Sequence, residues 1–361
     1  MSDLIDLSRN EFLFDHPLLV ADCLPRLTAR EICQYQAGTK LTTRLSQFHN
    51  IDPKFLCLFN GAEQTLKTTF NAVAHMPNTV LLIPSPSWEY YWKLSEAYET
   101  KAAPYHYREV GNTFEVDSQG LKETIKNAER VVLLIASPAN PLGCRTSDSE
   151  IKRLTQIVGE KGHTIIDQTY VGFSRSPEQA LSSALEELPS TLFVRSMSKY
   201  YGMPGLRVGY VAAQPDVLKA FSIMGDYLGF NAYSDQFSIE CINRHAEFAG
   251  IAEQAMGERE RLREFFSGLP GFKAFQSDTN FILVRVPERE YASYLMTNGI
   301  KVRTFPDDKL GDCVRITVPP KGIADRLIHL TSRFCTNSRI AASRPVDVST
   351  QGGCLINAAA K

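Results

Sequence analysis

Residues 191–210 read TLFVRSMSKYYGMPGLRVGY. The opening stretch, 191–196, is mainly apolar and β-branched, which predicts a strand buried on both faces. Comparable runs occur at residues 79–83, 131–136, 163–167 and 208–213, and stretches with the apolar spacing of helices lie between them. This alternation predicts an α/β fold, in which a mostly parallel sheet carries helices on both faces.

Helix signals separate these runs. Ser147-Asp-Ser-Glu150 forms a capping box, and residues 218–228 and 237–266 are expected to form longer helices. After Pro270-Gly271 the pattern predicts a smaller α+β domain, with strands at 280–286 and 314–318 and helices at 288–298 and 323–334.

The chain therefore divides into four expected parts. They are an N-terminal arm at 1–34, a large cofactor-binding domain at 35–268, a small domain at 269–336 and a poorly ordered tail at 337–361.

Charge and cysteine content exclude several classes of protein. The 39 Lys and Arg residues balance 40 Asp and Glu residues, so no long-range field attracts nucleic acid, and we expect no nucleic-acid partner. The eight cysteines form no CxxC pair, which argues against a disulfide framework and a metal site. We find no signal peptide and no apolar run near the ~20 residues of a membrane helix. We therefore expect a cytoplasmic protein with no membrane partner.

Polar groups follow the strand expected at 191–196. Ser196, Ser198 and Arg207 supply hydroxyls and a guanidinium that can bind a phosphate. Lys199, which lies among them, can form a Schiff base when it is partly desolvated. Taken alone, the pattern is short and favours an ordinary surface lysine after a strand.

Two further candidate groups follow neighbouring runs. Asp167, with Tyr170 after it, ends the run 163–167, where a carboxylate can hold a protonated ring nitrogen or simply cap the next helix. Asn140 lies after the run 131–136 in a turn fixed by two prolines. That turn can aim the Asn140 amide or serve as a plain loop.

The turn Gly61-Ala-Glu63 opens a helix, and backbone N–H groups at a helix N-terminus bind phosphate. Alone it favours an ordinary helix start. Together, however, Asn140, Asp167 and Lys199 lie at the carboxyl ends of strands, where open α/β sheets bind ligands. The whole set matches what pyridoxal 5'-phosphate (PLP) requires: an amine, an acid for the ring nitrogen, hydrogen-bond donors and a phosphate cradle.

From about residue 10 to residue 334 the chain resembles the fold-type I PLP-dependent aminotransferases, and within them the histidinol-phosphate aminotransferase-like group. Ser198-Lys199 with Gly205-Leu-Arg207 resembles the family's Schiff-base segment. Asp167-x-x-Tyr170 and Asn140-Pro-Leu-Gly143 resemble two further motifs of the family. The resemblance implies that Lys199 binds PLP covalently, that Asp167 contacts the pyridine nitrogen, and that Asn140 and Tyr170 complete the site.

The same resemblance assigns other residues. Ser196, Ser198 and Arg207 would bind the cofactor phosphate with the turn at Ala62 and Glu63, and Trp88 would stack on the pyridine ring. Tyr35 would reach the cofactor of the partner subunit, which implies a homodimer. Arg315, and less directly Arg303, would bind an anionic group of the substrate.

One departure concerns the substrate. The family's opening Asn-Glu-Asn-Pro-Tyr-Gly is here Asn10-Glu-Phe-Leu-Phe14-Asp15, with Asn10 and Phe14 expected at the substrate. Phe14 replaces a tyrosine that helps to hold the phosphate in the histidinol-phosphate enzymes. The missing hydroxyl removes a hydrogen bond to a charged group, ~1.5–3 kcal/mol, unless Tyr90 or Tyr91 supplies it. We therefore favour an α-amino acid over histidinol phosphate.

The expected activity is the transfer of an amino group between an amino acid, or an amino-alcohol phosphate, and a 2-oxo acid. A decarboxylase or a lyase/cyclase acting on a non-standard or phosphorylated amino acid is the alternative, because the same cofactor site serves these reactions. A non-catalytic PLP-binding regulator is disfavoured, since such regulators usually carry an added DNA-binding domain and nothing before Asn10 has room for one. The presence of Lys199, Asp167 and Arg207 argues against a pseudo-enzyme.

Overall fold

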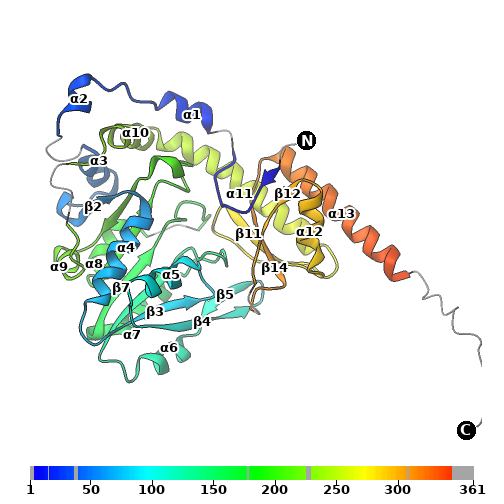
Figure 1. The fold of residues 1–361 in the computed structure, drawn as a ribbon, viewed down its shortest axis with the longest axis horizontal. Coiled ribbons are helices and arrows are strands. Elements are labelled where there is room, and N and C mark those ends of the chain that lie inside the picture. Colours follow the sequence, from blue (N-terminus) through cyan, green and yellow to red (C-terminus); the bar gives the residue numbers. More distant parts are fainter. Residues whose placement is uncertain are drawn as a thin grey trace, which may run out of the picture.

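The computed structural model describes residues 4–14, 16–35, 40–176, 179–224, 229–306 and 309–343. Its larger part is built on one sheet with the strand order β2-β9-β8-β7-β6-β3-β4-β5 (Figure 1). Strands β3, β4, β6, β7 and β8 pair in parallel, whereas β9 and β5 are antiparallel to their neighbours. The predicted mostly parallel sheet is confirmed. The strands are β2 Leu56–Phe59, β3 Thr79–Ser85, β4 Ala102–Val110, β5 Thr113–Val116, β6 Arg130–Ala136, β7 Gly162–Asp167, β8 Thr191–Ser196 and β9 Gly209–Ala212.

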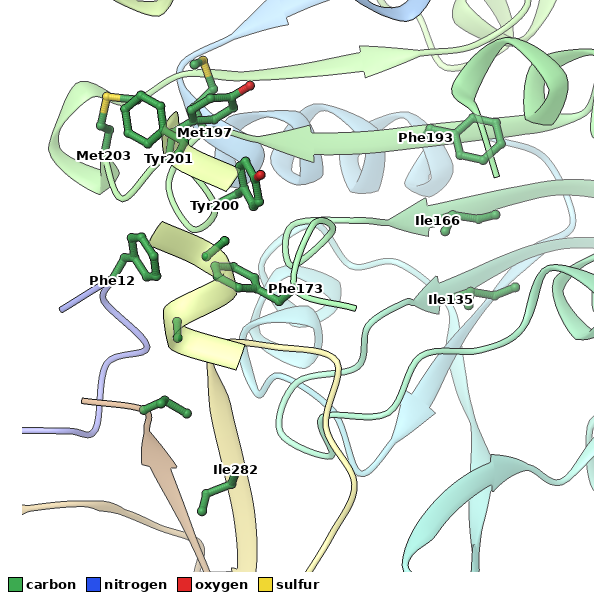
Figure 2. Packing of buried hydrophobic residues seen from close by; sticks show 14 of the residues in the cluster. Phe12, Ile135, Ile166, Phe173, Phe193, Met197, Tyr200, Tyr201, Met203 and Ile282 are labelled. Carbon is green, nitrogen blue, oxygen red and sulfur yellow. The ribbon is translucent and has the colours of Figure 1, made fainter. Parts of the chain in front are cut away.

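The central strands are apolar because both of their faces are covered. Ile135, Ile166 and Phe193 are register partners on β6, β7 and β8, and Figure 2 shows them side by side on one face of the sheet. Their sequence neighbours Leu134, Ile165 and Leu192 are likewise in register and belong to a separate cluster of buried side chains. Successive residues of a strand point to opposite faces, so each strand contributes to two cores.

Helices form the outer layers on both faces. Residues of α4, α5 and α9 belong to one buried cluster, and residues of α6, α7 and α8 belong to the other. Half of the predicted capping box is present at the start of α7: Ser147 Oγ accepts a hydrogen bond from the Glu150 backbone N–H at 3.2 Å, whereas the Glu150 carboxylate accepts from Arg153 Nε at 2.7 Å. These helices are α4 Gly61–Ala74, α5 Tyr90–Ala97, α6 Ser118–Ile125, α7 Asp148–Val158, α8 Leu181–Glu187 and α9 Pro215–Ala220.

Two expected helices differ from the structure. The helix expected at 218–228 is wrong beyond α9, which stops at Ala220; Ser222 then takes a φ of 52°, outside the helical region, and 225–228 lie outside the described residues. The single helix expected at 237–266 is two helices, α10 Ala232–Asn243 and α11 His245–Ser267. They are separated at Arg244, whose φ of −97° and ψ of 22° interrupt the helix.

The smaller part contains an antiparallel sheet with the order β10-β11-β14-β13, which confirms the expected α+β segment. The N-terminal arm joins it, because β1 (Ile5–Asp6) pairs in parallel with β12 (Ile300–Lys301). The remaining strands are β10 Lys273–Ala274, β11 Phe281–Arg285, β13 Arg303–Thr304 and β14 Cys313–Thr317. The arm contains α1 Pro17–Asp22 and α2 Ala29–Cys33, and the smaller part contains α12 Glu290–Thr297 and α13 Lys321–Ser343. Helix α3 (Lys40–His49) follows the arm and packs against α10 and β2 of the larger part.

The last helix is longer than expected. It was expected at 323–334, but α13 continues to Ser343 and projects from the smaller part in Figure 1. The predicted tail boundary at 337 is therefore wrong for residues 337–343, and the rest of that tail lies outside the described residues.

Candidate active site

A cavity of about 150 Å³ lies where β6 and β7 end, between the large sheet, the N-terminal arm and β14. It brings together seven of the side chains singled out in the sequence: Asn10, Trp88, Asn140, Asp167, Tyr170, Lys199 and Arg315. The other lining residues are Arg9, Tyr91, Ala136, Pro138 and Thr169.

Asp167 is the last residue of β7 and is only 6% exposed. Its Oδ2 accepts a hydrogen bond of 2.6 Å from the Tyr91 hydroxyl. Its Oδ1 accepts bonds from the Thr169 backbone N–H at 2.9 Å and from the Thr169 hydroxyl at 2.6 Å. The carboxylate is thus held at both oxygens, as a buried charge requires.

Arg315, on β14, meets Asn140 across the cavity. Its Nη1 donates to Asn140 Oδ1 and its Nη2 donates to the Ser8 carbonyl oxygen at 2.7 Å. Its Nε is buried and has no hydrogen-bond partner among the described residues. Burial lowers the pKa of the Arg315 guanidinium to about 10, so the group is still a cation at neutral pH. Only two of its five N–H groups are used by Asn140 and Ser8.

The arm closes the cavity at Lys199. The Lys199 ammonium donates to the Asn10 carbonyl oxygen at 3.1 Å and lies 5.7 Å from the centre of the Tyr170 ring. Asn10 is 1% exposed; its Nδ2 donates to the Tyr170 hydroxyl at 2.9 Å, and its backbone N–H donates to Thr317 Oγ1 at 2.9 Å. Asn10 therefore connects the amine, the phenol and the small sheet.

A second cluster, the helix-start cluster (Gly61, Ala62, Glu63 and Arg207), lies at the beginning of α4. Gly61 has a φ of +80°, and a Cβ at this position would lie 2.8 Å from Arg207 Nη2. The Arg207 guanidinium also donates to Glu63 Oε2 at 3.4 Å. A Cβ on Gly209 would lie 2.6 Å from the Ala62 backbone nitrogen. Glycines at both positions thus let a guanidinium and a strand approach a helix N-terminus, which is an anion-binding arrangement.

Ser196 is the last residue of β8, and Ser198 lies between it and Lys199. The Ser198 backbone N–H donates to Ser196 Oγ at 3.1 Å, which makes a tight turn at the end of the strand. Neither serine lines the cavity with Lys199.

Three further predicted residues, Phe14, Tyr35 and Arg303, also lie outside the cavity. Phe14 is 6% exposed and packs in the core against Phe12, with ring centroids 5.7 Å apart. Tyr35 is 81% exposed. Arg303 pairs in register with Arg315 but forms an ion pair with Glu89 at 3.4 Å.

The hydrogen bonds of Tyr91 and Thr169 to Asp167 were not predicted from the sequence. From the sequence, Tyr91 was a candidate only to supply a hydroxyl to a substrate phosphate. In the structure its hydroxyl donates a hydrogen bond to Asp167. The Tyr90 hydroxyl also has a partner in the protein, because it donates a hydrogen bond to Glu63 Oε1 at 3.0 Å. Arg9, at the rim of the cavity, had no distinguishing signal in the sequence.

The donor set fits PLP. The buried Asp167 carboxylate can receive a pyridinium N–H, and Asn140, whose Oδ1 is taken by Arg315, keeps its Nδ2 as a donor. Lys199 supplies an amine in the same cavity, and the helix-start cluster is an arrangement that suits a phosphate. Among the described residues, no group of three or more His, Cys, Asp or Glu side chains is arranged to bind a metal ion. Within the same residues, no helix is both long enough and apolar enough to cross a bilayer.

Comparison with known proteins agrees with this fit. Residues 2–334 match the family Aminotransferase class I and II. A histidinol-phosphate aminotransferase of Chlorobaculum tepidum is 25% identical over 341 residues, which cover 91% of this chain and 94% of that protein. One from Thermoanaerobacter pseudethanolicus is 27% identical over 296 residues, 80% of each chain.

Solved structures show the same fold. The histidinol-phosphate aminotransferase of Sinorhizobium meliloti, in complex with pyridoxal-5'-phosphate, aligns with a TM-score of 0.77 at 20% identity and covers 93% of this chain and 92% of that one. The L-threonine-O-3-phosphate decarboxylase of Porphyromonas gingivalis aligns with a TM-score of 0.76 at 21% identity, over 92% of this chain and 100% of that one.

The fold and the donor set define a fold-type I enzyme whose cofactor is PLP. The chain belongs to the aminotransferase class I and II family, since the match spans nearly the whole described structure. It is a PLP-dependent transaminase.

Proposed function

We propose that the cavity at Lys199 is the active site of this aminotransferase, and that its donor is an α-amino acid whose carboxylate binds Arg315. The observation that supports the proposal is the meeting of Lys199, Asp167 and Arg315 in one cavity. An amine, a buried carboxylate and a buried guanidinium with a free donor supply one partner each for a cofactor aldehyde, a ring nitrogen and a substrate anion.

Each residue then has a defined task. PLP, when bound, withdraws electrons from the substrate Cα and weakens the bonds to that atom. Lys199 Nζ is the base that removes the Cα proton. Asp167 accepts the ring N–H, Asn140 Nδ2 and Tyr170 donate to the cofactor, and Trp88 covers the ring. The cofactor phosphate is held by a larger set of groups, which comprises the N-terminus of α4 at Ala62 and Glu63, Ser196, Ser198 and Arg207.

Within the helix-start cluster, neighbouring side chains favour the ionised form of the Glu63 carboxylate. Three side chains contact the Glu63 carboxylate: Lys67 at 2.8 Å, Tyr90 at 3.0 Å and Arg207 at 3.4 Å. These contacts, and chiefly the hydrogen bond from Lys67, lower the pKa of Glu63. Glu63 therefore stays ionised beside Arg207, and its backbone N–H rather than its side chain is the group that would face a phosphate.

The substrate follows from the cavity's chemistry. Arg315 places a buried cation with N–H donors at the cavity, which suits a carboxylate, and Phe14 is packed in the core and has no hydroxyl to add. The second candidate donor is histidinol phosphate, which is favoured by the names of the curated relatives.

A half-reaction screen tests the proposal. Single amino acids and histidinol phosphate are added to the purified holoenzyme without an acceptor, and the visible absorbance of the bound cofactor is followed. We expect loss of that absorbance, formation of a 2-oxo acid and no release of CO2. A strong preference for histidinol phosphate would refute the α-amino acid, and CO2 release would identify a decarboxylase.

Assembly and location are parts of the proposal. We propose a homodimer in which Tyr35 reaches the cofactor of the partner subunit; its 81% exposure leaves the ring free for such a contact. A cytoplasmic location is supported by Cys23, Cys33, Cys144, Cys241 and Cys313, which form no disulfide in the described structure.

A further inference from the structure

Tyr91 lies at the start of α5 and reaches the end of β7. It is 2% exposed, and its hydroxyl donates to Asp167 Oδ2 at 2.6 Å. Desolvation by burial, and secondly the Asp167 charge, raise the pKa of Tyr91 well above its ordinary value. The phenol is therefore protonated at any working pH, and the proton of this short bond stays on the tyrosine.

The two carboxylate oxygens of Asp167 are bound by two different residues, one that precedes Asp167 in the sequence and one that follows it. Tyr91 binds Oδ2, and Thr169 binds Oδ1 with its backbone N–H and its hydroxyl. Rotation of the carboxylate about its Cβ–Cγ bond would break these bonds together. The plane of the carboxylate is therefore fixed before any ligand enters, which is the condition for efficient electrostatic stabilisation.

Tyr91 is itself held by aromatic neighbours. Its ring stacks on Phe70, with centroids 6.4 Å apart and an interplanar angle of 16°. Trp88 meets it edge-on at 5.6 Å and 80°. The same phenol thus touches both the residue proposed to cover the cofactor ring and the residue proposed to bind its nitrogen.

We propose that Tyr91 is a positioning residue, whose hydroxyl orients the Asp167 carboxylate toward the pyridine N–H of PLP. The proposal rests on the function proposed above for Asp167. It adds a group that acts through Asp167, and it explains why a phenol rather than a phenyl ring lies at the start of α5.

The test compares the holoenzymes of Tyr91→Phe, Thr169→Val, Asp167→Asn and Tyr105→Phe. Tyr105 is the matched control, because it is 1% exposed and its hydroxyl donates at 2.8 Å to the Leu134 carbonyl oxygen, away from Asp167. Three properties are measured without substrate: the melting temperature, the Kd for PLP added back to apoenzyme, and the pH titration of the visible absorbance of bound PLP. Values of kcat and KM complete the set.

For Tyr91→Phe we expect a tenfold to hundredfold lower kcat, the range for one hydrogen bond to a charged group, with a much smaller change in KM. The pH titration of the bound cofactor shifts in the same direction as in Asp167→Asn, but less. Thr169→Val shifts it in that direction too. Tyr105→Phe melts at a lower temperature than the wild type but titrates as the wild type does.

Two results would overturn the inference and leave the proposed function intact. One is a wild-type titration and a wild-type Kd for PLP in Tyr91→Phe while Asp167→Asn alters both. The other is a melting temperature far below that of Tyr105→Phe with an unchanged titration, which assigns Tyr91 to the core only. If Asp167→Asn itself leaves the titration and kcat unchanged, the proposed role of Asp167 fails, and the inference fails with it.

Discussion

Arg315 Nη1 donates a hydrogen bond to Asn140 Oδ1, and this bond joins the small sheet to the loop that follows β6. Both side chains line the cavity. The bond fixes which end of the Asn140 amide faces inward, since an oxygen that accepts from Arg315 leaves Nδ2 as the free donor. The group proposed to bind the substrate thus orients a group proposed to bind the cofactor.

Arg315→Gln is expected to lower kcat/KM for an anionic donor on the order of 100-fold or more, because a guanidinium makes two charge-assisted hydrogen bonds that a neutral amide cannot replace. Arg303→Gln is the matched control. Arg303 is the register partner of Arg315, but its side chain is 46% exposed and pairs with Glu89. Steady-state kinetics on the donor found in the half-reaction screen measure both. Equal losses in the two variants would argue that Arg315 has no special role.

Lys199→Ala is expected to abolish turnover, because among the described residues that line the cavity Lys199 carries the only amine, and the guanidinium groups of Arg9 and Arg315 do not form a Schiff base. Borohydride reduction of the wild-type holoenzyme, followed by peptide mass spectrometry, should find PLP on Lys199. Lys152→Ala, which removes an exposed ammonium paired with Glu187, is the control and should retain activity. Cofactor trapped on a different lysine would contradict the assignment.

Tyr35→Phe is expected to raise the Kd for PLP about tenfold while the protein sediments as a dimer, since one hydrogen bond to a phosphate is lost and little surface changes. Apoenzyme titration and analytical ultracentrifugation provide the two measurements. A fully active monomer would refute both the homodimer and the role of Tyr35.

Glu109 is expected to make stability depend on pH in the acid range. It accepts hydrogen bonds from Arg285 at 2.9 and 3.1 Å and one from Lys273, so β4 is tied to the small sheet. Chiefly the bond from Arg285 lowers the pKa of Glu109 to about 2 from a model-compound value of 4.5. A depressed pKa means that the contribution to stability is present above about pH 4.5 and is lost as the pH falls toward about 2.

Glu109→Gln should therefore lower the urea midpoint of the apoenzyme at pH 7, and the difference from the wild type should shrink between pH 4.5 and pH 2. The control is Glu187→Gln, at a pair with Lys152 in which both side chains are about half exposed. Such surface pairs are worth ~0–1 kcal/mol. A difference for Glu109→Gln that stays constant with pH would show that the ion pair is not its source.

Periodicity in the sequence was enough to predict the centre of the fold. The runs at 131–136, 163–167 and 191–196 are β6, β7 and β8 within a residue, because strands covered on both faces are apolar at every position. Strand β4, which lies between β3 and the edge strand β5, was not predicted, since only Tyr105 among its residues is buried and its polar residues give no such run. The break at Arg244 was also missed, because a change in ψ at one residue leaves the helical spacing of apolar residues intact.

The residues of the candidate site likewise fall into those that the sequence predicts and those that depend on tertiary packing. Asn140, Asp167 and Lys199 could be predicted because each follows a recognisable strand or turn. The bond between Tyr91 and Asp167 joins residues 76 positions apart, and its existence depends on how α5 packs against the sheet. The position of Phe14 in the core could not be predicted for a related reason. In an irregular arm, no repeating pattern of apolar residues indicates which side chains are buried.

The pairing of the arm with the small sheet sets an order of events during synthesis. Ile5 is register partner of Ile300, and the Asn10 backbone N–H bonds to Thr317, 307 positions away. The arm is synthesised well before these partners, because Thr317 lies 307 positions further along the chain than Asn10. A nascent chain that has completed the large sheet therefore carries Lys199 without its contact to Asn10. The cavity around Lys199 can be complete only after β14, which carries Arg315, has been released and the arm that carries Asn10 has packed against it.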